Sequence, residues 1–357
     1  MSATALELAR ELGHEELLAV HDPASGLRLF IAIHDTTLGP AVGGTRMRLY
    51  PSLDEAAADA LRLARAMTYK AALAEVPRGG GKAVIVGDPA RDKTRGLLAA
   101  YAKVLDRLGG RFFSGGDMGI DERDVAVMAR MTRYMSHAPA GARVDAPDLT
   151  ALGVFESIVS TAAVLGLEIA GLGVALQGLG QVGFRLARLL HAAGARLMVA
   201  DLDEGRVHRA VAELGASVAT PAGIYETAAD VFSPNAGGGI LNGDTVPRLR
   251  CHAVVGAANE QLDSPRDGDR LHQRGILYGP DYIVNAGGLL SLLYETSETD
   301  EEGVVGRVRA IGARLRGLLE RSRAEGIPPH RLADRVVEER LAAARAARGM
   351  LRPGYRE

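Results

Sequence analysis

The chain has 357 residues and a mass of 37.5 kDa, enough for two domains that each have their own core. Its 47% hydrophobic and 24% charged residues are ordinary for a globular protein, and the net charge of −2 gives no general attraction to nucleic acid or to anionic membranes. No uninterrupted apolar run reaches the roughly 20 residues that span a bilayer. The single cysteine, Cys251, excludes an internal disulfide and predicts a cytoplasmic protein. The spacing of the histidines does not predict a metal site.

The N-terminal part of the chain predicts an α/β domain that opens with an amphipathic helix. Residues 93–108 carry the pattern of a helix, and Asp117 lies in a Gly-rich loop that precedes another helix. The other expected elements, in chain order, are a helix over 52–74 that begins with a capping box, a flexible glycine loop over 79–81, and strands over 82–86 and 111–114.

The rest of the chain predicts a second α/β domain. The polar, Pro- and Gly-rich stretch over 140–150 is expected to be a hinge region, and a long helix follows over about 149–165. The expected strands cover 173–177 and lie near 196–200, 230–233, 253–256 and 282–285. Two helices that break near 326–329 end the chain. We therefore expect an α/β fold of two domains, residues 1–140 and residues 141–328.

A glycine motif, Gly178-Leu-Gly180-Gln-Val-Gly183, follows a predicted strand and opens a predicted helix. This arrangement is typical of a Rossmann-type, doubly wound domain, in which the helix N-terminus holds a pyrophosphate. Asp201 ends the next strand, where a carboxylate accepts hydrogen bonds from ribose hydroxyls and repels a 2′-phosphate. The pattern therefore favours NAD over NADP, although the nearby Arg206 would weaken that preference. The alternative is a Gly-rich turn that serves packing alone.

Lysine supplies four of the 42 basic residues, and arginine supplies the others. Arginine stays protonated in proteins, whereas burial or a neighbouring cation can make a lysine neutral. Lys93 and Lys103 lie in a polar stretch and are expected on the surface. Lys70 ends an apolar helix stripe and Lys82 follows three glycines. A buried Lys82 near Lys70 would act as a base, and a nearby Asp117 would shuttle protons. The alternative is a Lys–Asp salt bridge on the surface.

Six segments, in the same order as in a known family, carry a resemblance to it over about residues 25–295. They are Gly39-Pro-Ala-Val-Gly43-Gly44-Thr-Arg-Met47, Met67-Thr-Tyr-Lys70, Gly79-Gly-Gly-Lys82-Ala-Val-Ile, Gly116-Asp117-Met-Gly119, Gln177-Gly-Leu-Gly-Gln-Val-Gly183 and Pro280-Asp-Tyr-Ile-Val-Asn285-Ala-Gly-Gly288. These segments resemble the leucine/phenylalanine/valine dehydrogenases, which are relatives of glutamate dehydrogenase.

The resemblance implies NAD-dependent, reversible oxidative deamination of an L-amino acid to its 2-oxo acid and ammonia. Lys82 then polarises the carbonyl or activates water, and Asp117 exchanges protons with the amino group. Lys70 binds the substrate carboxylate with help from Gly43 and Gly44. Residues 1–140 become the substrate-binding, catalytic and oligomerisation domain, on which a C-terminal helix over about 329–357 packs, and residues 141–328 bind NAD. Hydride would cross the interdomain cleft, and the subunits would form a homo-oligomer.

The side-chain pocket that the resemblance implies is apolar, which favours an apolar substrate over glutamate. Gly115 lacks a methyl group found in leucine-type pockets, and Leu289 replaces a smaller residue. We therefore favour a phenylalanine-type over a leucine/valine-type substrate and keep both open. The other implied substrate contacts are Val42, Met67, Glu260 and Leu292. The implied cofactor contacts are Gly178, Gly180, Gln181, Val182, Gly183, Asp201, Thr150, Asn259 and Asn285.

Two segments depart from the family pattern. Glu260 stands where the family has an asparagine that contacts substrate, so its carboxylate would pair with the substrate ammonium or upset the charge balance. The segment Ala146-Pro-Asp148-Leu-Thr150 replaces Pro-Ser-Pro-Val-Thr and puts an acid near the cleft. Two alternatives therefore stay open: an enzyme for an unusual biosynthetic amino acid, and an inactive NAD-binding protein. The joint presence of Lys70, Lys82 and Asp117 argues against the second.

Overall fold

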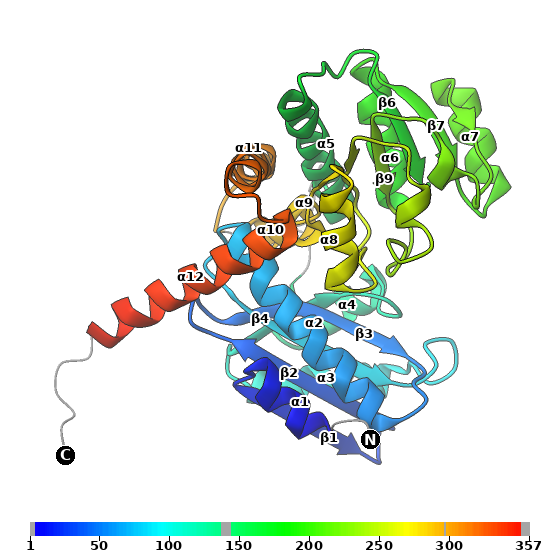
Figure 1. Cartoon of the computed structure of the whole chain (residues 1–357). Coiled ribbons are helices and arrows are strands. Elements are labelled where there is room, and N and C mark those ends of the chain that lie inside the picture. Colours follow the sequence, from blue (N-terminus) through cyan, green and yellow to red (C-terminus); the bar gives the residue numbers. More distant parts are fainter. Residues whose placement is uncertain (1–3, 137–143, 296–297, 351–357) are drawn as a thin grey trace. The chain divides into compact units, whose positions relative to one another are not determined.

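The computed structural model describes residues 4–136, 144–295 and 298–350. The chain divides into two compact units, and the first takes its residues from both ends of the chain. Unit 1 comprises Met1–Pro139 and Val337–Glu357, and unit 2 comprises Ala140–Val336. Figure 1 shows one sheet with flanking helices in each unit.

Among the described residues, the first unit holds a five-stranded mixed sheet. Its strand order is β1-β2-β4-β3-β5, in which β3, β4 and β5 run parallel and β2 is antiparallel to both β1 and β4. The strands are β1 (Glu16–Asp22), β2 (Leu27–Asp35), β3 (Ala41–Arg48), β4 (Gly79–Val86) and β5 (Phe112–Gly116). The sequence patterns predict no strand before residue 82, so β1, β2 and β3 are not anticipated by them.

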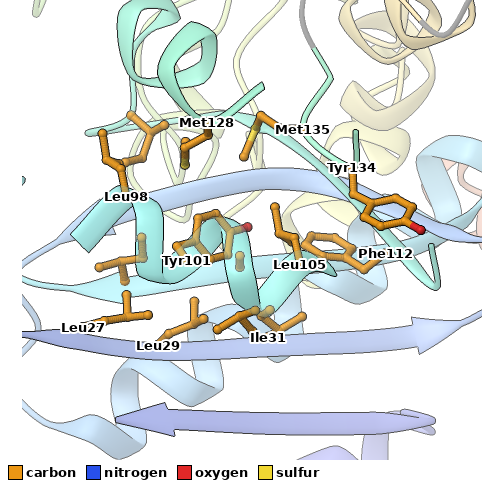
Figure 2. Packing of buried hydrophobic residues seen from close by; sticks show 14 of the residues in the cluster. Leu27, Leu29, Ile31, Leu98, Tyr101, Leu105, Phe112, Met128, Tyr134 and Met135 are labelled. Carbon is orange, nitrogen blue, oxygen red and sulfur yellow. The ribbon is translucent and has the colours of Figure 1, made fainter. Parts of the chain in front are cut away.

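Helices cover both faces of this sheet. They are α1 (Ala5–Leu12), α2 (Leu53–Leu73), α3 (Arg95–Arg107) and α4 (Glu122–Ala129). On one face, the small residues Ala56, Ala60 and Ala64 let α2 pack closely on β2 and β4. On the other, β2 and α3 share one hydrophobic core, and Figure 2 shows Leu98 and Tyr101 there. Burial of such large side chains contributes about 2 to 3 kcal/mol each.

The glycines Gly79–Gly81 form the start of β4, so the predicted flexible loop is wrong. A Cβ on Gly80 would lie 2.1 Å from the Thr68 nitrogen of α2, and one on Gly79 would lie 2.0 Å from the Asp35 oxygen of β2. The strand therefore needs glycine because the neighbouring backbones approach it closely, and not because it bends.

The C-terminal part of α12 (Pro329–Met350) belongs to the first unit from Val337 onward. The hydroxyl of Tyr69 donates to Glu338, and Arg340 donates to the Ala72 carbonyl over 3.0 Å. These contacts join the last helix to the end of α2, which carries Lys70.

In the described part of the second unit, six parallel strands follow the order β11-β10-β9-β6-β7-β8. They are β6 (Gly173–Gln177), β7 (Arg196–Ala200), β8 (Ser217–Val218), β9 (Val231–Pro234), β10 (Ala253–Val254) and β11 (Leu277–Tyr278). The chain first adds β7 and β8 on one side of β6, and then adds β9, β10 and β11 on its other side. This is the doubly wound order of a Rossmann domain, and its switch point lies between β6 and β9.

The helices of the second unit are α5 (Ala146–Leu165), α6 (Gln181–Ala192), α7 (Glu204–Leu214), α8 (Pro265–Gln273), α9 (Asp281–Val284), α10 (Gly287–Glu295) and α11 (Glu301–Glu325). By length and composition α5 could cross a membrane, with a mean hydropathy of 1.5. It packs instead against α6, α10 and α11, and this burial accounts for its apolar residues.

One prediction in this unit is wrong in its extent and another in its type of element. The boundary between the units lies at 139/140, where the expected hinge over 140–150 begins, but residues 146–150 belong to α5, because Asp145 and Asp148 form a capping box that starts the helix at Ala146. Residues 137–143 lie outside the described residues. The strand expected near 282–285 is the short helix α9, whose Ile283 and Val284 are buried. A four-residue apolar run does not distinguish a strand from a buried helical turn.

Candidate active site

The first unit brings Lys82 and Asp117 into direct contact. Lys82 lies in the middle of β4, opposite Ala32 of β2, and Asp117 follows the last residue of β5. The Lys82 ammonium donates to Oδ2 of Asp117. The lysine side chain is 8% exposed and the aspartate side chain 26% exposed. The alternative of a surface salt bridge is therefore excluded, because the lysine lies inside the unit.

Gly43 and Gly44 of β3 permit the close packing at this pair. A Cβ on Gly43 would lie 1.8 Å from the Gly81 oxygen, and one on Gly44 would lie 2.9 Å from Cβ of Asp117. Any larger residue would push β3 away from β4 or displace the aspartate. These glycines thus have a steric reason to be present, in addition to the role in binding substrate that the resemblance implies.

The electrostatic environment lowers the pKa of both groups. Burial lowers the pKa of Lys82 below its ordinary value, against the opposing attraction of Asp117. Burial raises the pKa of Asp117, but the positive charges of Lys82 and Arg46 outweigh it and the net pKa is lowered. Arg46 is also the cation whose charge lowers the pKa of Lys82. The sequence alone predicts this effect for Lys70.

Arg46 is a member of this cluster that the sequence analysis missed. Its Nε lies 3.4 Å from Oδ2 of Asp117, and its guanidinium donates to Oδ2 of Asp59 on α2 over 3.1 Å. The hydroxyl of Tyr50 donates to the same Asp59 oxygen over 2.5 Å. The sequence contains a pattern that predicts this, because Gly44 and Arg46 are two residues apart on one strand and therefore lie on the same face.

Lys93 is half-buried and not a plain surface residue, so that prediction is wrong. Its ammonium donates to Oδ2 of Asp124 over 2.5 Å and to the Gly119 carbonyl over 3.1 Å. Asp124 belongs to the capping box that starts α4. The lysine therefore anchors the loop that follows Asp117.

The other predicted substrate residues of this unit lie on the same elements. Lys70 is in the last turn of α2, and Cγ of Met67 lies 3.5 Å from the position of a Cβ on Gly43. Val42 is buried in β3. A Cβ on Gly115 would meet nothing within 4 Å, so there is open space beside β5. A larger side chain of the substrate is expected to fit there.

The second unit folds the glycine motif into a tight turn at the start of α6. Gly178 has a φ of +91°, and a Cβ on Gly183 would lie 2.0 Å from the Gly178 oxygen. Gly180 is the N-cap of α6 without a capping side chain, and a Cβ there would meet nothing within 4 Å. Gln181 and Val182 are the first residues of the helix. The open N-terminus therefore has room and free N–H groups for a pyrophosphate.

A cavity of about 540 Å³ adjoins this turn. Leu179, Gly180, Gln181, Phe184, Asp148, Arg185, Arg188, Arg206 and Arg209 line it. Four arginines beside a helix N-terminus suit the phosphates of a dinucleotide. Arg185 donates to Asp148 over 2.7 Å and to Asp145 over 2.9 Å, so the acid that departs from the family pattern has its charge balanced.

Asp201 has a structural task besides the predicted one. Its Oδ2 accepts from the Leu179 nitrogen over 2.6 Å, and its Oδ1 accepts from the Asp203 nitrogen over 2.8 Å. The guanidinium of Arg206 lies 3.8 Å from Oδ2. The carboxylate therefore fixes the glycine turn while Arg206 offsets part of its charge.

The remaining predicted residues of this unit gather around Asn285. Its amide nitrogen donates to the Ala257 carbonyl over 3.0 Å and to Oδ1 of Asn259 over 2.9 Å. Its own Oδ1 is buried and has no hydrogen-bond partner among the described residues. An unpaired buried acceptor is costly unless a ligand satisfies it, so it suits the amide of a nicotinamide. Thr150 lies beside the same segment, since a Cβ on Gly288 would be 2.9 Å from its Oγ1.

Glu260 and two leucines complete the predicted set. Glu260 is exposed at a φ of +51°, and its backbone nitrogen donates to Oδ2 of Asp281 over 2.8 Å. Asparagine adopts this left-handed conformation more readily than glutamate does. Leu289 and Leu292 are buried on α10.

The chain is similar in sequence to known amino-acid dehydrogenases. Residues 14–134 match the model of the Glu/Leu/Phe/Val dehydrogenase dimerisation domain, and residues 199–349 match that of the Glutamate/Leucine/Phenylalanine/Valine dehydrogenases. A leucine dehydrogenase of Bacillus subtilis (strain 168) is 40% identical over 94% of this chain and 93% of that enzyme. A phenylalanine dehydrogenase of Thermoactinomyces intermedius is 42% identical, with the same coverages of 94% and 93%.

The crystal structure of L-tryptophan dehydrogenase from Nostoc punctiforme superposes with a TM-score of 0.83 and 40% identity, over 95% of this chain and 99% of that one. Its likeness extends across both units, as do the matches to the two enzymes above. The chain belongs to the glutamate, leucine, phenylalanine and valine dehydrogenase family.

Proposed function

We propose that this protein catalyses the NAD-dependent, reversible oxidative deamination of an apolar L-amino acid to its 2-oxo acid and ammonia. The observation that carries the proposal is the buried Lys82–Asp117 pair, in which burial lowers the pKa of the lysine. A dinucleotide-binding protein without catalysis does not need a buried ion pair in its other unit, because burying charges is costly.

Each residue has a defined task in this proposal. Lys70, in the last turn of α2 where the helix dipole favours a cation, binds the substrate carboxylate through its ammonium. Lys82 in its neutral form takes a proton from the water that attacks the imine carbon. Asp117 takes a proton from the substrate ammonium before hydride transfer and returns it to the nitrogen of the carbinolamine, so that the carbon–nitrogen bond breaks and ammonia leaves. Bound NAD would supply the hydride acceptor for the substrate Cα.

The cofactor proposal rests on residues of the second unit. The open N-terminus of α6 and the arginine-lined cavity would hold the phosphates, and Asp201 would hold the adenosine ribose. The unpaired Oδ1 of Asn285 would accept from the nicotinamide amide. Asp201 favours NAD over NADP, because a carboxylate repels a 2′-phosphate.

The expected substrate carries an apolar side chain, and an aromatic one is favoured over a branched aliphatic one. Buried Val42 and the open space beside Gly115 support this choice. Leu289 and Leu292 are assigned to the same role by resemblance. The exposed acid Glu260 supports a second candidate within the same chemistry, an unusual biosynthetic amino acid. We also propose that the enzyme works as a homo-oligomer in the cytoplasm; the match to a dimerisation domain supports the first part.

A substrate panel tests the proposal. NADH formation is measured with L-phenylalanine, L-tryptophan, L-leucine, L-valine and L-glutamate. Turnover is expected with an apolar amino acid and not with glutamate. Binding of NADH without turnover of any amino acid would instead identify an inactive NAD-binding protein.

Lys82→Ala gives a second test, with Lys103→Ala as the matched control. Lys103 is exposed on α3, so its loss should leave the rate unchanged. Lys82→Ala should abolish turnover and leave the Kd for NADH unchanged, because the glycine motif lies in the other unit. A parallel loss of NADH binding would show that Lys82 has been assigned the wrong role.

A further inference from the structure

The carboxylate of Asp117 lies between two cations that come from different strands. The Lys82 ammonium of β4 donates to Oδ2, and Nε of Arg46 on β3 lies 3.4 Å from the same oxygen. Arg46 is in turn held by Asp59 of α2 over 3.1 Å. The four side chains therefore alternate in sign, from lysine through aspartate and arginine to aspartate, and each is largely buried.

We propose that Arg46 is a positioning residue for the reaction: it holds the Asp117 carboxylate and shifts the proton balance of the pair towards neutral lysine and ionised aspartate. This inference rests on the proposed function for the identity of the reaction, and on the geometry above for the role of the arginine. The guanidinium suits the position because it reaches two carboxylates at once and stays protonated.

The charge of Arg46 acts on both partners in the same direction. Its repulsion lowers the pKa of Lys82, and its attraction lowers the pKa of Asp117. Both changes favour the form in which Lys82 takes a proton from water. Loss of the arginine should therefore raise both pKa values together, which distinguishes it from a change that merely loosens the site.

The Nε of Arg46 can also donate a further hydrogen bond. This atom is buried and has no hydrogen-bond partner among the described residues, and 3.4 Å to Asp117 is too long for a good hydrogen bond. When the substrate engages the Lys82 ammonium, Asp117 loses that donor. Arg46 is the neighbouring cation able to replace it, so the carboxylate keeps its place through the proton transfers.

The other charged groups around Lys82 are common to every variant proposed below. From α2 come Asp59 and, three turns further along, Lys70. His34 lies on β2, two residues beyond Ala32, which pairs with Lys82. Burial lowers the pKa of His34 to about 4, so that this histidine is neutral at working pH. Tyr50 is held protonated by burial, with a pKa of about 12. Differences between variants therefore report on Arg46.

The chain offers a direct measurement, because it contains four lysines. Lysine labelled with ¹³C at Cε gives one NMR signal for each, and the Lys82→Ala spectrum identifies the signal of Lys82. The titration of this signal is followed in the wild type, Arg46→Gln, Arg46→Lys and Arg48→Gln. Arg48 is the matched control, since it lies on the same strand and reaches Asp59 at 3.7 Å but makes no contact with Asp117 among the described residues.

Arg46→Gln should raise the pKa of Lys82 by about one unit, the low end of the effect of a neighbouring charge. The acid limb of the pH profile of kcat/KM for oxidative deamination should move by the same amount. Arg46→Lys keeps the charge and should leave the titration near that of the wild type, while kcat falls because an ammonium cannot hold two carboxylates. Arg48→Gln should change neither.

The proposal is overturned if Arg46→Gln lowers the rate while the Lys82 titration and the pH profile stay in place, or if Arg48→Gln gives the same shift. If Arg46→Gln does not fold, Arg46→Lys with an unchanged kcat overturns the positioning role. The NMR titration needs no turnover. An inactive wild type would therefore refute the proposed reaction, whereas an unmoved Lys82 signal would refute the role of Arg46.

Discussion

The buried lysine predicts a pH-dependent cost for Asp117→Asn. In this variant the Lys82 ammonium, with its side chain 8% exposed, keeps its position but loses the anion that balances it. An uncompensated buried charge costs about 3 to 5 kcal/mol. The alternative is that Lys82 releases its proton. With an unfolded pKa of about 10.4 and about 1.36 kcal/mol per pH unit, this release costs at most about 4.6 kcal/mol at pH 7. At pH 9 the same release costs about 1.9 kcal/mol.

The sign follows from proton binding. Removing Asp117 lowers the folded pKa of Lys82 further, so that the unfolded state binds more protons than the folded state. Stability of the variant then rises with pH between its folded pKa and about 10.4. The destabilisation relative to the wild type should therefore shrink between pH 7 and pH 9, until the wild-type lysine also loses its proton.

Urea unfolding of the full chain at pH 7, 8 and 9 and constant protein concentration measures this effect. The control is Lys82→Met combined with Asp117→Asn, compared with Lys82→Met alone, because a chain without the lysine has no such proton to release. Their difference should not change with pH. An equal cost of Asp117→Asn at pH 7 and pH 9 would refute the reasoning, since it would mean that the lysine is not left as a buried charge.

Three further predictions concern the other predicted site residues. Glu260→Gly should stabilise the protein by about 1 kcal/mol in thermal unfolding, because glycine adopts its φ of +51° without strain; a loss of stability would mean that the side chain makes a contact of greater value. Gly115→Ala should lower kcat/KM for phenylalanine relative to leucine by about tenfold, the scale of one methyl group in a pocket, in matched steady-state assays; equal changes for both substrates would place the pocket elsewhere. Arg206→Ala should weaken NADPH binding more than NADH binding, measured by calorimetry, because Arg206 offsets the charge of Asp201; an unchanged affinity ratio would exclude that role.

Local patterns predicted the second unit better than the first. Strands followed by helices alternate along residues 173–278, and each βα step can be recognised within about 30 residues. In the first unit, β4 pairs with β2 and β3, which precede it by some 50 and 40 residues, and the register between them is set by tertiary packing. The close approach of Thr68 to Gly80 is also invisible in a local pattern, so the three glycines were read as a loop.

The sequence predicts the chemical groups at the centre of the site, but it does not predict all of the residues that surround them. The scarcity of lysine singled out Lys82, and a glycine-rich segment singled out Asp117. The structure joins them. Arg46 was overlooked because arginine is the common cation of this chain, so its presence carried no compositional signal. Lys93 was placed on the surface because its partner Asp124 lies 31 residues away, beyond the reach of periodicity.

The first unit has a topological consequence for biosynthesis. Residues from Val337 onward complete it, yet about 200 residues of another unit are translated between its two segments. The helix that meets Tyr69 and Ala72 is therefore synthesised only after the whole second unit. Because domains generally fold as units during synthesis, we expect the second unit, whose sequence is continuous, to be able to fold before the first unit has all of its residues.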